Sequence, residues 1–201
     1  MIKHIIFDFG NVLARFYPDE LSAPYVTDAE EKKLIGDIVF DRLYWDNLDI
    51  GSISDEEVRS GIRSRLPEKL HEKACAVYDN WVKNLTPVKG MQELVADIAK
   101  TDSKIYLLSN ISKLFADTYS EVEWIQKLFS NFDGIVLSGP IGKIKPNKDI
   151  FDHITEKFDI DKNDCIFIDD SSINIEGAKK AGINGYLFDG NADKLREFLF
   201  K

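Results

Sequence analysis

The sequence predicts an α/β fold: a doubly wound parallel sheet with a helical cap inserted after the first strand. From residue 86 to residue 201, short apolar runs alternate with amphipathic segments, which is typical of parallel strands joined by crossover helices. Between residues 27 and 84 the apolar spacing is helical, so this stretch interrupts the alternation. Because crossovers between parallel strands are right-handed, the core helices should cover both faces of the sheet.

The composition fits a globular protein with one core and a small insertion. The chain has 201 residues, of which 44% are apolar and 30% are charged. Its net charge of -9 argues against a general nucleic-acid surface, although an anionic small substrate remains compatible with it. No apolar stretch approaches the roughly 18 residues of a membrane span. The two cysteines form no metal or redox motif, so we expect free thiols and a cytoplasmic location. We also expect a monomer or a weak dimer.

The first strand is expected within residues 5–13, which open with the apolar run Ile5-Ile6-Phe7. An unbroken apolar run suits a strand that is buried on both faces of a parallel sheet. Asp8 follows this run, at the carboxyl edge where open α/β sheets bind ligands. Asp is also common where a turn begins, so Asp8 alone does not decide between a site and a turn.

Residues 16–85 are predicted to form the helical cap, and residues 1–15 and 86–201 to form the α/β core. Helix starts in the cap are expected at Thr27, Ser54 and Pro67. The serine start is the best defined, because a Ser-x-x-Glu spacing is the pattern of a capping box.

The elements of the core follow in order along the chain. Further strands are predicted over residues 105–108, 135–137, 165–168 and 186–188. Helices are predicted over residues 90–100, 112–129, 149–158, 173–181 and 192–200, with a loop over residues 139–142.

Polar residues follow three of these strands, and a lysine lies in the loop region after another. They are Asp8, Ser109, Asn110, Asp169 and Asp170, with Lys145 as the lysine. Parallel strands share a carboxyl edge, so these side chains should meet there. Carboxylates this close repel one another unless a cation lies between them, and a few carboxylates completed by water suit Mg²⁺. Lys145 and Ser109 could then hold a phosphoryl group, beside the N–H groups of a helix that starts at Pro146.

Each of these residues also has an ordinary structural interpretation. Asp169 and Asp170 could cap the helix that follows them. Ser109 with Asn110 could form a turn, and Lys145 could be a solvated charge. Their joint occurrence at strand ends favours a site.

The same residues belong to four ordered motifs that resemble those of the haloacid dehalogenase-like (HAD) hydrolase superfamily. The motifs are Phe7-Asp8-Phe9-Gly10-Asn11-Val12, Leu108-Ser109-Asn110, Gly142-x-x-Lys145-Pro146 and Ile168-Asp169-Asp170-Ser171-x-x-Asn174. The resemblance covers essentially the whole chain, and the helical insertion resembles the C1-type cap of that superfamily. The Asp-x-Gly-Asn-Val form is most similar to the branch of the bacterial α-glucose-1-phosphate phosphatase and the phosphatase domain of soluble epoxide hydrolase.

The resemblance implies a Rossmann-like core and a role for each motif residue. Asp8 would be the nucleophile that forms an aspartyl-phosphate, and Lys145 would assist it. The Mg²⁺ ligands would be Asp8, Asp170 and the backbone carbonyl of Gly10. Ser109, the N–H of Asn110 and Lys145 would bind the phosphoryl oxygens. Asp169 and Asn174 would orient the last motif through hydrogen bonds, without binding the metal themselves.

Gly10 departs from the common pattern of the superfamily. Most of its phosphatases carry a second Asp at this position, as general acid to the leaving group. General acid catalysis contributes roughly 10²–10⁴-fold, or about 3–5 kcal/mol. The similar phosphatase branch also has Gly here, which implies a leaving group that departs easily, such as an anomeric sugar oxygen. Asn11 or a water molecule could assist.

These observations predict a Mg²⁺-dependent phosphatase acting on a small phosphomonoester, with a sugar phosphate as the favoured class. One alternative is a non-catalytic or weakly active binding protein on the same scaffold. A less favoured alternative is a 2-haloacid dehalogenase, which usually has an aromatic residue at the position of Gly10. The cap should select the substrate. Its candidate contacts are Arg15, Tyr17, Tyr44 and Trp45, although the cap core is the favoured place for the last two and Arg15 is better explained as a surface charge at the hinge.

Overall fold

The computed structural model describes residues 2–201 and contains a five-stranded sheet in the order β5-β4-β1-β6-β7. The strands are β1 (His4–Phe7), β4 (Lys104–Ser109), β5 (Gly134–Leu137), β6 (Cys165–Asp169) and β7 (Asn184–Leu187). All neighbouring strands in this sheet are parallel. The predicted α/β fold, with a parallel sheet and a helical region after the first strand, is therefore confirmed.

Strand β1 occupies the centre of the sheet. Phe7 pairs in register with Leu107 of β4 and Ile168 of β6, so the three strands reach the carboxyl edge at the same level. The N–H of Asp8 continues the ladder by donating to the carbonyl of Ile168 at 2.9 Å. This register places Asp8 beside the polar residues that end the two neighbouring strands.

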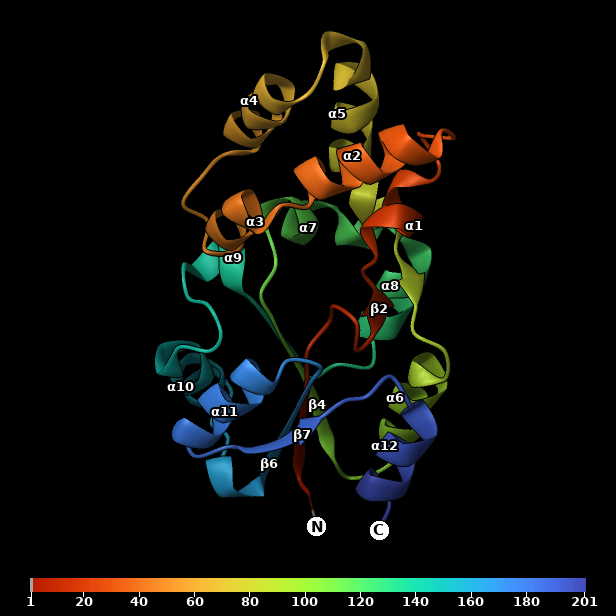
Figure 1. Ribbon diagram of the computed structural model, residues 1–201. Coiled ribbons are helices and arrows are strands. Elements are labelled where there is room, and N and C mark those ends of the chain that lie inside the picture. The colour runs from red at the N-terminus through yellow and green to blue at the C-terminus, as the bar shows by residue number, and fades with distance from the viewer. Residues whose placement is uncertain (1) are drawn as a thin grey trace.

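Helices cover both faces of the sheet (Figure 1). They are α6 (Met91–Ile98), α8 (Glu123–Phe129), α10 (Lys148–Lys157), α11 (Ser172–Lys180) and α12 (Ala192–Leu199). Helices α7 (Lys113–Thr118) and α9 (Ser138–Ile141) lie beyond the carboxyl edge of the sheet (Figure 1), and the 3₁₀ turns are η3 (Tyr119–Glu121) and η4 (Lys162–Asp164). Successive side chains of β1 point to opposite faces. Ile5 and Phe7 therefore pack in the cluster that α6, α8 and α12 share. Ile6 packs in the cluster formed with α10 and α11.

A helical region lies above the carboxyl edge of the sheet (Figure 1). It consists of α1 (Pro18–Ser22), α2 (Ala29–Val39), α3 (Arg42–Asp49), α4 (Asp55–Arg65), η1 (Glu68–Leu70), α5 (His71–Asn80) and η2 (Trp81–Asn84). We call residues 18–84 the helical region. Its helices share an apolar cluster of their own, centred on residues such as Ile35, Ile62 and Tyr78. The antiparallel pair β2 (Ala14–Arg15) and β3 (Thr86–Pro87) joins it to the sheet.

Two of the predicted helix starts in this region differ from the structure. Asp28, not Thr27, caps α2, and its side chain accepts from the N–H groups of Glu30 and Glu31. A carboxylate competes well for this position because it accepts two N–H groups at the positive end of the helix. After Pro67 the chain forms only the turn η1, and α5 begins at His71. The capping box at Ser54 is confirmed.

Three predictions for the core need correction. Strand β1 ends at Phe7, because the chain turns directly after Asp8 and the N–H groups of residues 13 and 14 both donate to the carbonyl of Phe9. Residues 138–141 form the short helix α9 instead of a loop. Helix α10 begins at Lys148, not at Pro146, and the Lys145–Pro146 peptide bond is cis. No helix within residues 2–201 is long and apolar enough to cross a membrane.

The capping box at the start of α4 predicts a measurable contribution to stability. Ser54 Oγ accepts from the N–H of Glu57 at 3.2 Å, and the Glu57 carboxylate accepts from the N–H of Ser54 at 2.8 Å. Ser54→Ala removes the first bond, so we expect the free energy of unfolding to fall by about 1 kcal/mol in urea denaturation. Ser60→Ala, an exposed change in the same helix, should stay within about 0.5 kcal/mol of wild type. Equal losses in both variants would contradict a capping role.

Candidate active site

The predicted polar residues meet at the carboxyl edge of the sheet, around a cavity of about 860 Å³. The sheet side of the cavity is lined by Asp8, Gly10, Ser109, Asn110, Lys145, Asp170 and Asn174. The opposite wall belongs to the helical region, mainly to α3. Asp169 lies behind the lining, fully buried. The cavity thus lies between the two parts of the fold, as a ligand site of an open α/β sheet should.

A buried lysine links two of the carboxylates. Lys145 Nζ lies 2.7 Å from Asp8 Oδ1 and 2.7 Å from Asp169 Oδ2, and the lysine side chain is only 1% exposed. Burying a charge is costly unless it is paired and hydrogen-bonded. The two carboxylates meet that requirement, so Lys145 is not the solvated charge that remained possible from the sequence.

Asp169 is held in place by three donors. Besides Lys145, it accepts from the N–H of Ser171 at 2.8 Å and from Asn174 Nδ2 at 3.0 Å. Asp169 therefore orients Lys145 and the start of α11, and its oxygens are already engaged by protein donors. The structure brings together Asp169 and Asn174 as the sequence motif predicted.

Asn110 fixes the loop that carries Lys145. Its Nδ2 donates to the carbonyl of Lys145 at 2.9 Å, and its Oδ1 accepts from the N–H of Lys145 at 2.8 Å. The side-chain amide thus pairs with the backbone of the lysine in both directions. From the sequence we had expected only the backbone N–H of Asn110 to matter, so this side-chain role was missed.

Close packing against α11 holds the same loop from the other side. A Cβ atom on Gly177 would lie 2.4 Å from the carbonyl oxygen of Pro146, so only glycine allows this approach. On the cavity side, Ser138 accepts from the N–H of Ile111 at 2.8 Å and ties α9 to the loop after β4. The sequence does not indicate these roles of Gly177 and Ser138, because the residues that they contact are distant along the chain.

The turn after Asp8 is shaped by Asn11. Asn11 has a positive φ of 55°, and its Oδ1 accepts from the N–H of Phe16 at 3.1 Å. Asn tolerates this left-handed conformation better than most residues. The side-chain amide of Asn11 has no titratable proton, so Asn11 cannot serve as the missing acid. Gly10 faces open space: a Cβ atom there would meet no atom within 4 Å.

Burial shifts the ionisation of the cluster. It raises the pKa of Asp8 to about 7, with Lys145 opposing the shift and Asp169 adding to it. Burial and the neighbouring Asp169 also raise the pKa of Asp170. Burial alone would lower the pKa of Lys145, but Asp8 and Asp169 outweigh it and raise that pKa, which keeps the ammonium charged.

The carboxylates also meet the requirements of a divalent cation. Asp8, Asp169 and Asp170 each place one oxygen within 4.8 Å of the others. Hard oxygen ligands in this number suit Mg²⁺, and a cation would favour the ionised form of Asp8 and Asp170. The oxygens of Asp169 are engaged by Lys145, Ser171 and Asn174, which leaves Asp8 and Asp170 as the candidate carboxylates for a cation.

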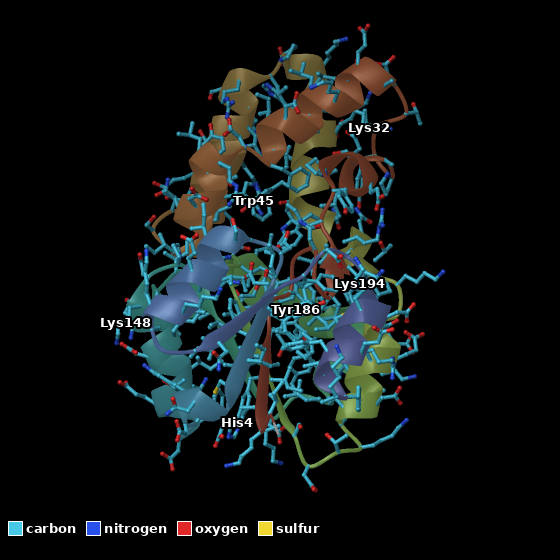
Figure 2. All side chains as sticks on the ribbon, turned by 60° about the horizontal axis from the view of Figure 1, so that its bottom comes forward. His4, Lys32, Trp45, Lys148, Tyr186 and Lys194 are labelled. Carbon is cyan, nitrogen blue, oxygen red and sulfur yellow. The ribbon has the colours of Figure 1, made fainter. Side chains whose placement is uncertain are left out.

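Only one of the four predicted substrate contacts from the cap lines the cavity. Trp45 does so, and it lies on the side of the helical region that faces the sheet (Figure 2). It is buried, and its Nε1 donates to the carbonyl of Val39 at 2.7 Å. The other three candidates are not among the lining residues. Arg15 pairs with Glu20 and stacks on Tyr17 at the surface, and Tyr44 packs against Gly61 inside the helical region.

The cavity wall contains a carboxyl group that was not among the predicted site residues. Asp49, the last residue of α3, is only 7% exposed, and its Oδ1 has no hydrogen-bond partner among the described residues. Burial raises its pKa to about 7, and the neighbouring Asp46 adds to this. A sequence signal for it exists: Asp49 lies four residues after Trp45 and next to Leu48, so helical spacing places all three on the face that α3 buries.

Sequence and structural similarities link the chain to known hydrolases. Residues 48–187 match the family model described as haloacid dehalogenase-like hydrolase. The D-ribitol-5-phosphate phosphatase of Bacteroides thetaiotaomicron is 24% identical over 210 residues, which cover 98% of this chain and 97% of the relative. A sesquiterpene phosphatase of Aspergillus oryzae is 24% identical over 184 residues, or 91% of this chain and 88% of the relative. A magnesium complex of a HAD family enzyme from B. thetaiotaomicron has a TM-score of 0.73 and 25% identity, covering 98% of both chains.

The contact between Gly177 and Pro146 predicts that Gly177→Ala disturbs the lysine loop. Adding a methyl group 2.4 Å from a carbonyl oxygen forces the backbone apart, which typically costs about 1–3 kcal/mol. We expect urea denaturation to show this loss. Lys180→Ala, at an exposed position of the same helix, is the control and should leave stability nearly unchanged. A Gly177→Ala variant as stable as wild type would show that the loop yields without cost.

The buried Asp49 predicts a dependence of stability on pH. Its pKa rises from its ordinary value of 3.8 to about 7 on folding, so the folded state binds more protons between these values. Stability should therefore fall as pH rises through this window, and Asp49→Asn should remove that fall. Relative to wild type, we expect the variant to gain up to roughly 3 kcal/mol between pH 5 and pH 8 in urea denaturation. A stability difference that is the same at both pH values would show that folding leaves the Asp49 pKa unchanged.

Proposed function

Because the chain belongs to the haloacid dehalogenase-like hydrolase family, we propose that it is a Mg²⁺-dependent phosphatase of small phosphomonoesters. Asp8 is its proposed nucleophile, and a sugar phosphate is the favoured class of substrate. The proposal includes the division of the chain into a core of residues 1–15 and 86–201 and a cap of residues 16–85.

One observation carries this proposal: Asp8 shares a buried lysine with Asp169 at the edge of a cavity, with Asp170 close by. A nucleophilic carboxylate must be held in one orientation, and Lys145 does this at 2.7 Å. The same ammonium offers positive charge where the phosphoryl oxygens would lie. A carboxylate, a lysine and a cation site together favour transfer of an anionic group.

The proposed Mg²⁺ ligands are Asp8, Asp170 and the backbone carbonyl of Gly10. The bound ion would neutralise negative charge so that a carboxylate can approach a phosphate. The Asp8 carboxylate attacks phosphorus and forms an aspartyl-phosphate, which water then hydrolyses. Ser109 Oγ, the N–H of Asn110 and Lys145 Nζ bind the oxygens of the transferring group.

The cavity supports a small polar substrate. Its volume of about 860 Å³ lies within the range of ordinary metabolite sites. The wall opposite Asp8 mixes aromatic residues such as Trp45 and Trp81 with polar residues such as Arg42 and Asn47. Such a wall can stack on an apolar face and bind hydroxyl groups. The similar D-ribitol-5-phosphate phosphatase is consistent with a polyol or sugar phosphate.

The cysteines are consistent with a proposed cytoplasmic location. A monomer or a weak dimer is proposed separately, as expected from the sequence. Cys75 and Cys165 are both free. Burial raises the pKa of Cys165 to about 12, so its thiol is unreactive at neutral pH.

The proposal is tested by phosphate release from a panel of esters, with Mg²⁺ or with EDTA. The panel holds p-nitrophenyl phosphate, glucose 1-phosphate, glucose 6-phosphate, ribitol 5-phosphate and a nucleotide. We expect Mg²⁺-dependent turnover by wild type and a loss of at least about 10³-fold in Asp8→Asn, because the amide is not a nucleophile. Asp37→Asn, an exposed change in α2, should behave as wild type. A preference for anomeric phosphates would support an easily departing leaving group.

Folded protein that binds Mg²⁺ but releases no phosphate from any ester would refute the proposed activity. Such a result would favour a binding protein on this scaffold. Metal-independent release of halide from a 2-haloacid would favour a dehalogenase instead.

A further inference from the structure

A phosphatase that releases an ordinary alcohol gains from a proton donor on the side of the cavity away from Asp8. In an in-line displacement the attacking and leaving oxygens lie on opposite sides of phosphorus. Asp8 lies at the sheet edge, so the leaving oxygen must face the helical region. Gly10 supplies no side chain, and Asp170 is a proposed metal ligand. The donor must therefore come from elsewhere in the lining.

Two further carboxyl groups line the cavity, and both belong to α3. Asp46 is 63% exposed and pairs with Arg42 at 3.2 Å, so it already has a partner at the surface. Asp49 is 7% exposed, and its Oδ1 has no hydrogen-bond partner among residues 2–201. A buried carboxyl oxygen without a partner is rare because leaving it unsatisfied costs free energy. Asp49 lines the cavity, and no hydrogen bond to its Oδ1 competes with a ligand for the carboxyl group.

We propose that Asp49 is the general acid of the reaction and donates its proton to the leaving-group oxygen from the helical region. This inference rests on the proposed phosphatase function. It assigns to α3 the task that a side chain at position 10 would perform in the core.

Asp49 gives up a proton when the aspartyl-phosphate forms and regains one when it is hydrolysed. As the Asp8 oxygen bonds to phosphorus, the bond from phosphorus to the ester oxygen breaks, and that oxygen takes the Asp49 proton and leaves as an alcohol. Asp49 is then a carboxylate. In the second step water bonds to phosphorus, its proton passes to Asp49, and the bond from Asp8 to phosphorus breaks. The products are the alcohol and inorganic phosphate, and both carboxyl groups return to their starting forms.

The surroundings of Asp49 keep its proton available near neutral pH. Burial raises its pKa to about 7, Asp46 and Asp8 add to the shift, and Arg42 and Lys145 oppose it. Helix α9, which packs against α3, consists of Ser-Gly-Pro-Ile and brings no ionisable side chain. A general acid is most effective when its pKa lies near the working pH.

The test compares esters whose leaving groups differ in their need for a proton. A p-nitrophenolate departs readily without one, whereas an alkyl alcohol does not. For Asp49→Asn we expect kcat/KM to fall by about 10²–10⁴-fold on the best alkyl phosphate of the panel. On p-nitrophenyl phosphate the fall should stay below about tenfold. Asp37→Asn is the matched control, because it removes a carboxylate from the same region far from the cavity lining.

Several outcomes would overturn the inference while the proposed function stands. These are an equal loss on both esters, no loss on either, and a wild type that hydrolyses the aryl ester but none of the alkyl esters. An equal loss would mean that Asp49 binds substrate without donating a proton. Absence of turnover by wild type on every ester would refute the phosphatase function itself.

A measurement on wild type keeps the inference testable if Asp49→Asn does not fold. The ratio of kcat/KM for the alkyl ester to kcat/KM for the aryl ester cancels the ionisation of Asp8, which both reactions share. Above about pH 7 both esters are fully ionised, and there we expect this ratio to fall by up to roughly tenfold per pH unit. A ratio that does not change from pH 6 to pH 9 would overturn the inference.

Discussion

A single buried ammonium, that of Lys145, holds the site together. It lies 2.7 Å from an oxygen of Asp8 and 2.7 Å from an oxygen of Asp169, in a place where none of the three charges is well solvated. Removing one partner of such a pair leaves an uncompensated charge, typically at a cost of about 3–5 kcal/mol. Two carboxylates facing one lysine also leave a net negative charge, which is why a cation beside Asp8 and Asp170 fits the arrangement. The nucleophile is thereby oriented before any substrate arrives.

Neighbouring residues hold Lys145 and Asp169 in the positions that this interaction requires. Asn110 holds the backbone of Lys145, Asn174 and the N–H of Ser171 hold Asp169, and the glycine at 177 lets α11 approach the lysine loop. These groups come from distant parts of the sequence. The parallel sheet brings them together, because its register sets the ends of β1, β4 and β6 at one level. Precision at the site therefore depends on the stiffness of the sheet more than on the loops themselves.

The core half of this site could be predicted from the sequence, and the other half could not. Asp8, Ser109 and Asp169 follow apolar runs, and strand ends of a parallel sheet meet wherever the helices lie. By contrast, the role of a helical-region residue depends on how that region packs over the sheet. Trp45 was expected either in the cavity or in the cap core; it lines the cavity, and its buried part packs in the cluster that continues into the sheet. For Asp49 the helical spacing gives the face that it shares with Trp45 and Leu48, but not that this face lies against the cavity.

Gly10 and Asp49 together suggest how the work of a catalytic pair can be shared between two parts of a fold. The space beside Gly10 is open, so no clash forbids a side chain there. An acid at that position would, however, add another carboxylate next to Asp8, Asp169 and Asp170, where like charges already raise pKa values. An acid on α3 lies in the opposite wall of the cavity, apart from these three carboxylates. Its burial costs stability above neutral pH, a cost that proteins accept mainly at functional sites. A proton donor carried by the helical region would also tie catalysis to how that region closes over the substrate.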